Sequence, residues 1–180
     1  MPGRIDEKKK FVPVRMAVVT VSDSRTAEND TSGDVLVARL TDAGHKLAHR
    51  SIVTDDSAAI EALLNTLIAD ATIDVVITTG GTGVTGRDVT PEAFARVCEK
   101  NIEGFGELFR MLSYAKVGTS ALQSRATAGV ANGTYLFAVP GSPGACKDAW
   151  DGILVHQMDI RHRPCNFVEL MPRLKEHLAQ

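Results

Sequence analysis

The chain has 180 residues, 44% of them hydrophobic and 23% charged, which is enough for one globular domain with a sizeable core. Its net charge of −2 excludes the basic surface that binds nucleic acid or an anionic membrane. No apolar run approaches the roughly 20 residues that cross a bilayer, and nothing near Met1 resembles a signal peptide. We therefore expect a cytoplasmic protein that binds neither nucleic acid nor membrane.

The first part of the chain alternates predicted strands and helices. Residues 1–14 are polar and include the run Lys8-Lys9-Lys10, which predicts a disordered N-terminal tail. An apolar run predicts a strand at 15–21, and apolar residues at helical spacing predict a helix at 31–43. A weaker strand at 46–53 and a helix at 58–69 follow.

The second part of the chain continues this alternation. Asn132-Gly133 is the residue pair favoured in tight two-residue turns and predicts a hairpin between two strands. With no internal repeat or linker, the pattern predicts a single α/β domain over 15–180, a three-layer αβα fold with a mostly parallel central sheet and one local antiparallel hairpin. The remaining predicted elements are strands at 74–79, 125–130 and 134–139 and helices at 91–100, 105–114, 143–157 and 167–178, the last interrupted by Pro172.

The stretch 75–91, VVITTGGTGVTGRDVTP, is the most informative part of the sequence. It runs from a buried strand into a glycine-rich loop, then to Asp88 and a helix start with Thr90 as N-cap and Pro91 at the first helical position. The glycines of Gly80–Gly83 let the backbone approach a ligand closely. Exposed amides and hydroxyls beside one carboxylate suit a phosphate–metal site.

The same loop also spells G-x-G-x-x-G, the fingerprint of dinucleotide-binding folds, through Gly81, Gly83 and Gly86. That fingerprint requires the helix to open at the glycines. Here Pro91 sets a later helix start, because a proline inside a helix costs about 3 kcal/mol. We therefore do not expect a nicotinamide or flavin site. A P-loop is excluded as well, since no Gly-Lys-Ser/Thr follows.

Polar segments follow each of the predicted parallel strands. Ligands of such sheets bind beyond the carboxyl ends of the strands, where helix N-termini also favour anions. Carboxylates near an anion site are explained most simply by a bridging divalent cation such as Mg²⁺. Asp55 and Asp88 are the first candidates for that pair and Asp23 the third. The four polar segments are Ser22-Asp-Ser-Arg25, Thr54-Asp-Asp-Ser57, the loop from Gly80 to Asp88, and Pro140-Gly-Ser-Pro-Gly144.

Simpler interpretations stand beside these. Asp55, Asp56 and Ser57 have the alternative role of capping the helix that follows, and Asp88 that of an ordinary acid before a helix. Ser142 is a helix N-cap in either case. The apolar stripe that begins at Phe105 favours a core or subunit interface over a ligand site. The three widely spaced cysteines favour reduced thiols over disulfides or zinc: Cys98, Cys146 and Cys165.

Taken together, the motifs resemble the MoaB/MogA family of molybdenum cofactor biosynthesis proteins. The resemblance covers most of the chain from Arg15 to Phe167, and its GFGELFRMLS and RPCNF segments resemble the MoaB branch in particular. The matching segments are TVSDSR (Thr20–Arg25), NDTSG (Asn29–Gly33), TTGGTG (Thr78–Gly83), RDVTPEA (Arg87–Ala93), GFGELFRMLS (Gly104–Ser113), LQSRATAGV (Leu122–Val130), PGSPGA (Pro140–Ala145) and RPCNF (Arg163–Phe167).

This resemblance implies the molybdopterin-binding fold and, for the MogA branch, adenylylation of molybdopterin by Mg-ATP with release of pyrophosphate. It implies that Asp55 and Asp88 are catalytic and bind Mg²⁺. It also implies a homo-oligomer, a trimer or hexamer, that works with other enzymes of the molybdenum cofactor pathway. Some MoaB-branch proteins lack one or both acids. This chain retains Asp55 and an intact Arg87–Pro91 segment, which favours an active enzyme.

The resulting hypothesis is a Mg²⁺-dependent molybdopterin adenylyltransferase. One alternative is a non-catalytic pterin-binding or scaffold protein of the same pathway, and another is a nucleotide hydrolase that needs no pterin. Arg125 is the expected charge partner of the pterin phosphate. The predicted nucleotide and phosphate side consists of Ser22, Asp23, Thr79, Gly80, Gly81, Thr82 and Gly83, and the predicted pterin side of Ser124, Arg125, Pro140, Gly141 and Ser142.

Overall fold

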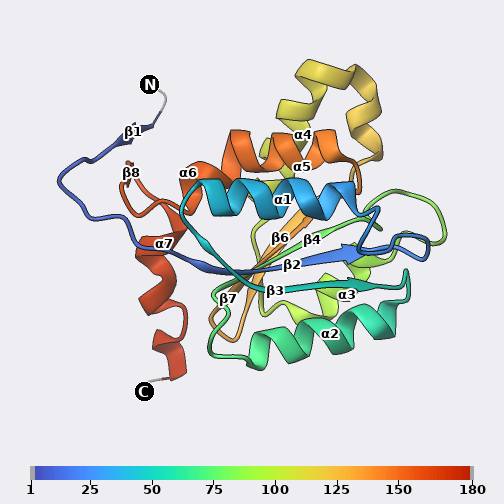
Figure 1. Cartoon of the computed structure of the whole chain (residues 1–180), viewed down its shortest axis with the longest axis horizontal. Helices are drawn as coiled ribbons and strands as arrows, with labels where there is room; N and C mark the ends of the chain where they lie inside the picture. The colour runs from blue at the N-terminus through green and yellow to red at the C-terminus, as the bar shows by residue number, and fades with distance from the viewer. Residues whose placement is uncertain (1–2, 179–180) are drawn as a thin grey trace.

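The computed structural model describes residues 3–178, and a six-stranded sheet forms its centre (Figure 1). Its strands are β2 (Arg15–Val21), β3 (Lys46–Val53), β4 (Val75–Thr79), β5 (Lys100–Asn101), β6 (Thr127–Ala131) and β7 (Thr134–Val139). They lie in the order β3-β2-β4-β7-β6-β5. The first four of that order run parallel, whereas β6 and β5 are antiparallel to their neighbours. The predicted mostly parallel sheet is therefore confirmed.

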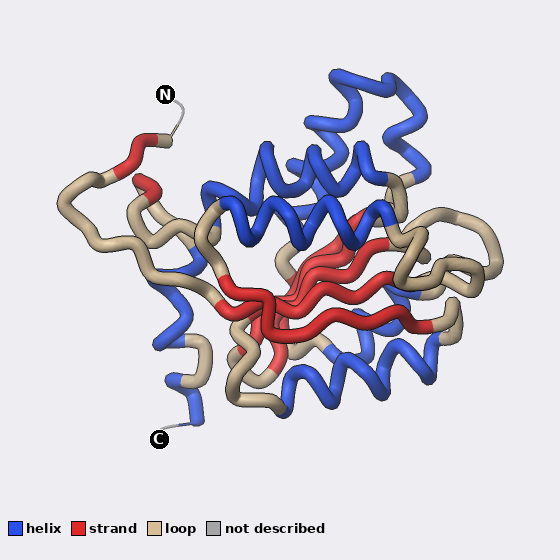
Figure 2. Tube along the Cα trace, in the orientation of Figure 1, coloured by secondary structure: helices blue, strands red, loops and turns tan. Residues whose placement is uncertain are grey.

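Helices cover both faces of this sheet, so the predicted three-layer αβα fold is also confirmed (Figure 2). One face is covered by α1 (Thr31–Asp42), α4 (Glu103–Val117) and α5 (Pro143–Ala149). A π-helical turn, η2 (Trp150–Leu154), and α6 (Val155–Gln157) continue α5, where the sequence predicted one regular helix. The other face is covered by α2 (Ser57–Ala69) and α3 (Thr90–Val97).

The core consists of two clusters, one on each side of the sheet. Alternate residues of a strand point to opposite faces, so Ile77 joins the cluster under α1 and α4 while Val76 joins the cluster over α2 and α3. Both side chains are fully buried. The same alternation sends Phe137 to the first cluster and Leu136 to the second. Burial on both faces explains why the sequences of these strands are continuous apolar runs.

The predicted hairpin between β6 and β7 is confirmed. Asn132 and Gly133 both have positive φ, 46° and 80°, as a two-residue turn matched to the strand twist requires. Thr127 pairs with Ala138 and Ala131 with Thr134 in antiparallel register. The turn therefore fixes which residues of β7 face which layer.

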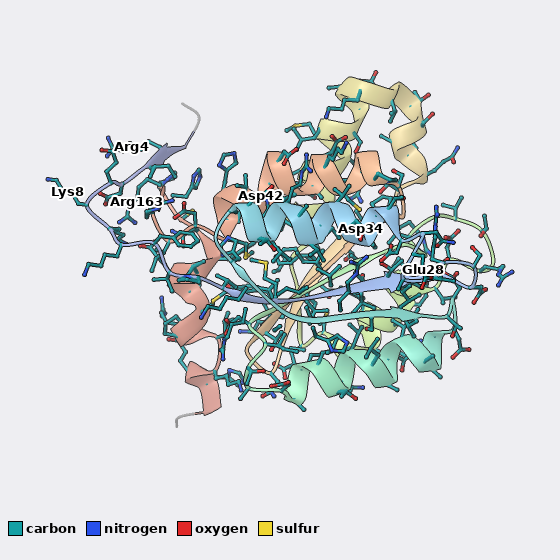
Figure 3. The ribbon with its side chains drawn as sticks, viewed as in Figure 1. Arg4, Lys8, Glu28, Asp34, Asp42 and Arg163 are labelled. Atoms are coloured by element: carbon teal, nitrogen blue, oxygen red, sulfur yellow. The ribbon has the colours of Figure 1, made fainter. Side chains whose placement is uncertain are left out.

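The prediction of a disordered tail does not hold for residues 3–14, while residues 1–2 lie outside the described part. Residues Arg4–Ile5 form β1, which pairs antiparallel with β8 (His162–Arg163) (Figure 3). Asp6 pairs with Arg163, and Lys9 pairs with Glu169. Composition shows a charged segment but not its partner, which here lies more than 150 residues away.

The C-terminal helix predicted at 167–178 is shorter than expected. It consists of α7 (Phe167–Leu170) followed by two 3-10 turns, η3 (Met171–Arg173) and η4 (Glu176–Leu178). A further 3-10 segment, η1 (Gly118–Gln123), extends α4. Among residues 3–178, no helix combines the length and apolar character that a membrane crossing requires.

A buried histidine gives this fold a testable pH dependence. His45 lies between Phe11 and Trp150, and its Nδ1 accepts a hydrogen bond from the Val14 amide at 3.2 Å. Burial lowers the pKa of His45 to about 4, although the charge of Asp159 opposes the shift. Between pH 6.5 and 4 the unfolded chain therefore binds more protons than the folded one. The His45 contribution to stability is complete above pH 6.5 and decreases as the pH falls, by up to about 1.4 kcal/mol per pH unit.

Urea unfolding of the wild type and of His45→Asn across pH 4 to 7 tests this expectation. Asparagine retains an acceptor for the Val14 amide but does not titrate. The free energy of unfolding of His45→Asn should therefore depend less steeply on pH than that of the wild type. Parallel curves for the two proteins would show that His45 does not control this dependence.

Candidate functional site

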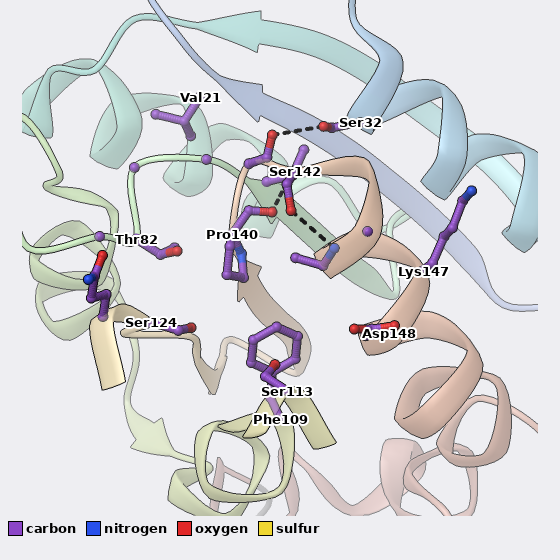
Figure 4. A pocket seen from close by; sticks show the side chains of 18 of the residues that line it. Val21, Ser32, Thr82, Phe109, Ser113, Ser124, Pro140, Ser142, Lys147 and Asp148 are labelled. Carbon is purple, nitrogen blue, oxygen red and sulfur yellow. Dashed lines mark hydrogen bonds between the residues drawn. The ribbon is translucent and has the colours of Figure 1, made fainter. Parts of the chain in front are cut away.

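A pocket of about 1380 Å³ lies at the edge of the sheet where the parallel strands end (Figure 4). It is lined by the segments that follow β2, β4 and β7, by Asp55 after β3, and by α4, η1 and α5. The structure thus brings together the polar segments that the sequence predicted beyond the carboxyl ends of the strands. The predicted site residues that line the pocket are Ser22, Asp55, Thr79, Gly80, Gly81, Thr82, Gly83, Asp88, Ser124, Pro140, Gly141 and Ser142.

The glycine-rich loop is pressed against the end of β2. Gly80 has a φ of 110°, and a Cβ on it would collide with the carbonyl oxygen of Val21. Gly81 has a φ of 63°, and a Cβ there would collide with the hydroxyl of Thr90 and lie 3.1 Å from Asp55 Oδ1. The loop amides therefore lie close to the acid in a conformation that side chains would exclude.

Thr90 contributes to this loop in a way the sequence did not predict. It is the first residue of α3 rather than its N-cap, and its hydroxyl donates to the Gly80 carbonyl at 2.9 Å. Its amide donates to the Gly81 carbonyl at 3.0 Å. Both of these groups are directed at the loop. Thr90 therefore connects the start of α3 to the glycine loop, and Pro91 is the second residue of the helix, one position later than predicted.

Asp55 and Asp88 come from different segments, and the charge of Asp88 acts on Asp55. Burial, and then the negative charge of Asp88, raises the pKa of Asp55. Of the three residues that could cap α2, Asp56 is the N-cap and accepts from the Ala59 amide at 2.8 Å, so Asp55 does not fill that role. The Asp55 carboxylate is thus available to the pocket.

Asp88 is held by its own loop. Its Oδ2 accepts from the amide and the hydroxyl of Thr85 at 2.8 and 2.7 Å. Burial works against the charged form, but these hydrogen bonds, a further one from the Gly83 backbone and the charge of Arg125 outweigh it and lower the pKa of Asp88. Asp88 therefore provides a fixed negative charge next to the less acidic Asp55.

This pair fits a divalent cation. The charge of Asp88 disfavours the charged form of Asp55, and a cation between the two carboxylates removes that repulsion. Mg²⁺ is commonly held by one or two carboxylates together with substrate phosphates. Within residues 3–178, no group of three or more His, Cys, Asp or Glu side chains gathers into a metal site. The donor set therefore suits a metal that arrives with a phosphate ligand.

Two predicted site residues occupy other positions. In the described part of the chain, the pocket lining includes neither Asp23 nor Arg125. Asp23 Oδ1 accepts from the Asp55 amide at 3.1 Å, and its Oδ2 pairs with Arg87. Arg125 contacts the backbone of the glycine loop and pairs with Glu92. The role of Arg125 at a pterin phosphate stays a prediction, and in this structure loop carbonyls and Glu92 occupy its guanidinium.

The predicted pterin side is built from the loop after β7. Ser142 is the N-cap of α5 and accepts from the Ala145 amide at 3.1 Å, while the Gly141 carbonyl accepts from the Ser32 hydroxyl at 2.9 Å (Figure 4). Thr79 donates to the Pro140 carbonyl at 3.0 Å. Burial raises the pKa of the Cys146 thiol to about 11, so this thiol is a packing group and not a nucleophile.

Sequence reasoning missed the wall formed by α4, η1 and α5. Phe105 and Phe109 belong to the core, as the apolar stripe predicted, but Phe109 also lines the pocket. Helical spacing places Leu112, Ser113 and Lys116 beyond Phe109 on neighbouring faces of α4, a signal that could have indicated a mixed wall. The lining residues that the sequence did not single out include Phe109, Leu112, Ser113, Lys116, Ser120, Lys147 and Asp148.

Comparisons with known proteins agree with this architecture. Residues 17–160 match the family model MoCF_biosynth, described as a probable molybdopterin binding domain. Molybdenum cofactor biosynthesis protein B of Escherichia coli K12 is 48% identical over 167 residues, which cover 93% of this chain and 96% of that protein. A crystal structure of molybdenum cofactor biosynthesis protein B is 38% identical with a TM-score of 0.84, covering 93% and 99% of the two chains. The molybdopterin biosynthesis enzyme MoaB of Thermus thermophilus is 29% identical with a TM-score of 0.70, covering 78% and 89%.

Proposed function

The chain belongs to the MoCF_biosynth family of probable molybdopterin-binding domains, and on that premise we propose that it acts in molybdenum cofactor biosynthesis as a Mg²⁺-dependent molybdopterin adenylyltransferase. The observation that carries this proposal is the pair Asp55 and Asp88 beside the glycine loop, in one pocket. A protein that only held a pterin would not need a carboxylate at Asp55 whose charged form Asp88 disfavours.

The proposed reaction transfers an adenylyl group. An oxygen of the terminal phosphate of molybdopterin attacks the α-phosphorus of ATP, and a new P–O bond forms. The bond from that phosphorus to the oxygen that bridges the α- and β-phosphates breaks, and pyrophosphate leaves with the bond's electron pair. Adenylylated molybdopterin is the other product. The protein contributes position and charge and forms no covalent bond.

The residues that line the pocket suit this reaction. Amides of Gly80–Gly83 would donate to the nucleotide phosphates, with Ser22 next to them. Asp55 and Asp88 would hold Mg²⁺, which when bound offsets negative charge on the phosphates. Asp23 would act through Asp55, whose amide it holds.

The pterin would lie along the wall made by the β7–α5 loop and the end of α4. Ser124 and the segment Pro140–Ser142 line this part of the pocket. Positive charge for a pterin phosphate would come from Lys147, which lines the same pocket, in place of Arg125. Lys116 lines the pocket as well but pairs with Asp148.

We further propose that the chain forms a homo-oligomer, a trimer or hexamer, and that it meets other enzymes of the pathway. Five large apolar side chains on α4 and η1 are 37–79% exposed, and exposed apolar surface of this kind suits a contact between subunits. Light scattering on the purified chain would measure the assembly. The five residues are Leu108, Met111, Tyr114, Val117 and Leu122.

Pyrophosphate release tests the enzymatic proposal. The wild-type protein is mixed with ATP, Mg²⁺ and molybdopterin, and each component is omitted in turn. We expect one pyrophosphate per pterin consumed, and release only in the complete mixture. Release without pterin would identify a nucleotide hydrolase instead. Pterin binding without any release would identify a non-catalytic binding protein.

A further inference from the structure

Arg125 connects two points of the loop that carries Asp88. It lies between η1 and β6, and its backbone amide donates to the Thr82 carbonyl at 2.9 Å. Its Nε donates to the Gly83 carbonyl at 2.6 Å, and its Nη2 to the Asp88 carbonyl at 2.7 Å. One guanidinium thus binds the first and the last residue of the segment 83–88.

Between these two points the segment is held by its own hydrogen bonds and by the ion pair of Arg87 with Asp23. Val84 at its tip is 65% exposed. Thr85 and Asp88 bond each other, through the Asp88 amide to the Thr85 carbonyl at 3.1 Å and through the Thr85 amide to Asp88 Oδ2 at 2.8 Å. An exposed turn of this kind opens readily unless its ends are fixed.

Glu92 orients the guanidinium from the opposite side. It lies in the first turn of α3, and its carboxylate pairs with Nη1 and accepts from Nη2 at 3.2 Å. The planar guanidinium can bind two carbonyls and a carboxylate at once, which a lysine ammonium on a flexible stem does not reproduce. The ion pair with Glu92 therefore fixes the orientation of the Arg125 guanidinium. Both carbonyls that the guanidinium binds belong to one loop.

We propose that Arg125, oriented by Glu92, is a positioning residue that fixes both ends of the segment 83–88 and thereby holds the Asp88 carboxylate at the pocket beside Asp55. This inference rests on the proposed function for its kinetic consequence, but not for its structural one. It replaces the role in pterin binding that the sequence suggested for Arg125.

The test compares Arg125→Lys and Glu92→Gln with Arg96→Lys. Arg96 lies on the same helix as Glu92 and is also ion-paired, to Glu61, but it is outside the pocket lining in the described part. The first measurement is hydrogen exchange of the Thr85 and Asp88 amides in the ligand-free protein. We expect exchange at both amides about tenfold faster in Arg125→Lys, less accelerated in Glu92→Gln and unchanged in Arg96→Lys.

The second measurement separates positioning from pterin binding. In the pyrophosphate assay, the Mg²⁺ concentration for half-maximal rate should rise about tenfold in Arg125→Lys, as for other residues that orient metal ligands. The KM for molybdopterin should stay at the wild-type value. A raised KM for molybdopterin with unchanged Mg²⁺ dependence would show that Arg125 binds the pterin, and it would overturn the proposal.

The hydrogen-exchange measurement tests the positioning role of Arg125 even if the wild type releases no pyrophosphate. In that case the proposed function fails, while faster exchange at Thr85 and Asp88 still supports the role of Arg125 in the loop. Wild-type exchange rates in Arg125→Lys would overturn the positioning role whatever the activity. Far-UV circular dichroism and thermal unfolding of each variant identify any loss of the fold.

Discussion

Asp88→Asn should reduce pyrophosphate release by about 10²–10⁴-fold, the range seen when one group that stabilises transferred phosphoryl charge is removed. The fold should survive, because an asparagine oxygen still accepts from the amide and hydroxyl of Thr85 that hold Asp88 Oδ2. What is lost is the negative charge. With Asp55 as the remaining carboxylate, the site would hold Mg²⁺ more weakly, so part of the lost rate should return at high Mg²⁺ concentration.

The same variant has an effect that does not depend on turnover. The charge of Asp88 is one cause, after burial, of the raised pKa of Asp55. Removing that charge should bring the pKa of Asp55 back toward its ordinary value, although burial keeps it from returning fully. A carbon-detected NMR titration of the aspartate carboxyls in the wild type and in Asp88→Asn measures this change.

Asp56→Asn is the matched control. Asp56 is the neighbour of Asp55 in sequence, but its side chain caps α2, and asparagine is as good an N-cap as aspartate. Its rate and the Asp55 titration should equal those of the wild type. Near wild-type release from Asp88→Asn would remove Asp88 from the reaction, and an unchanged Asp55 pKa would show that the two carboxylates do not interact.

The elements that the sequence predicted well are those whose signals are local. The bounds of β2 and β3 match the predicted strands, and β2 in particular is marked by a continuous apolar and β-branched run. Pro91 correctly placed the start of α3 beyond the glycines, which removed the dinucleotide interpretation. Asn132-Gly133 identified the hairpin because only a few residues tolerate positive φ at two successive positions.

The elements that were missed depend on partners far away in the chain. The short strands β1 and β5 exist only because β8 and β6 offer free edges, and their own residues carry no strand pattern. Arg125 illustrates the same limit in the site. Its charge and its place beside Ser124 favoured a ligand phosphate, whereas the loop carbonyls and Glu92 that bind it are 33–42 residues away in sequence.

The sheet topology explains why the sequence could place Asp55 and Asp88 in one pocket. Parallel strands must end on one edge, so Asp55 and Asp88 had to approach each other once the sheet order was correct. The choice between Asp55 and Asp56 as the N-cap of α2 is instead decided by backbone dihedral angles. Asp56 has the extended conformation of an N-cap, with φ −125° and ψ 125°. Sequence alone left that choice open.

Gly80→Ala should lower the free energy of unfolding by about 3–5 kcal/mol, the sum of a strained backbone and an overpacked contact. Gly80 has a φ of 110°, where L-residues are strained, and the new Cβ would collide with the backbone carbonyl of Val21. That carbonyl belongs to β2 at the centre of the sheet and cannot move aside as a side chain can. The loop would therefore have to move away from the strand end.

Urea unfolding at equilibrium measures this loss, and pyrophosphate release should fall with it even where the variant is still folded. The displaced loop carries the amides proposed to bind phosphate, and Thr90 transmits the displacement to α3 through its bond to the Gly80 carbonyl. A fully stable and active Gly80→Ala would mean that the loop does not press on β2.

Gly86→Ala is the control within the same loop. Its φ lies outside the left-handed range, and no heavy atom lies within 4 Å of the position that a Cβ would take there. We expect a stability equal to that of the wild type or higher by about 0.4–1 kcal/mol, because alanine restricts the unfolded chain more than glycine does. Gly80→Ala and Gly86→Ala lie six residues apart in the same loop. A loss of stability in Gly80→Ala alone would therefore be due to the close approach of Gly80 to Val21 and not to a general need for glycine in the loop.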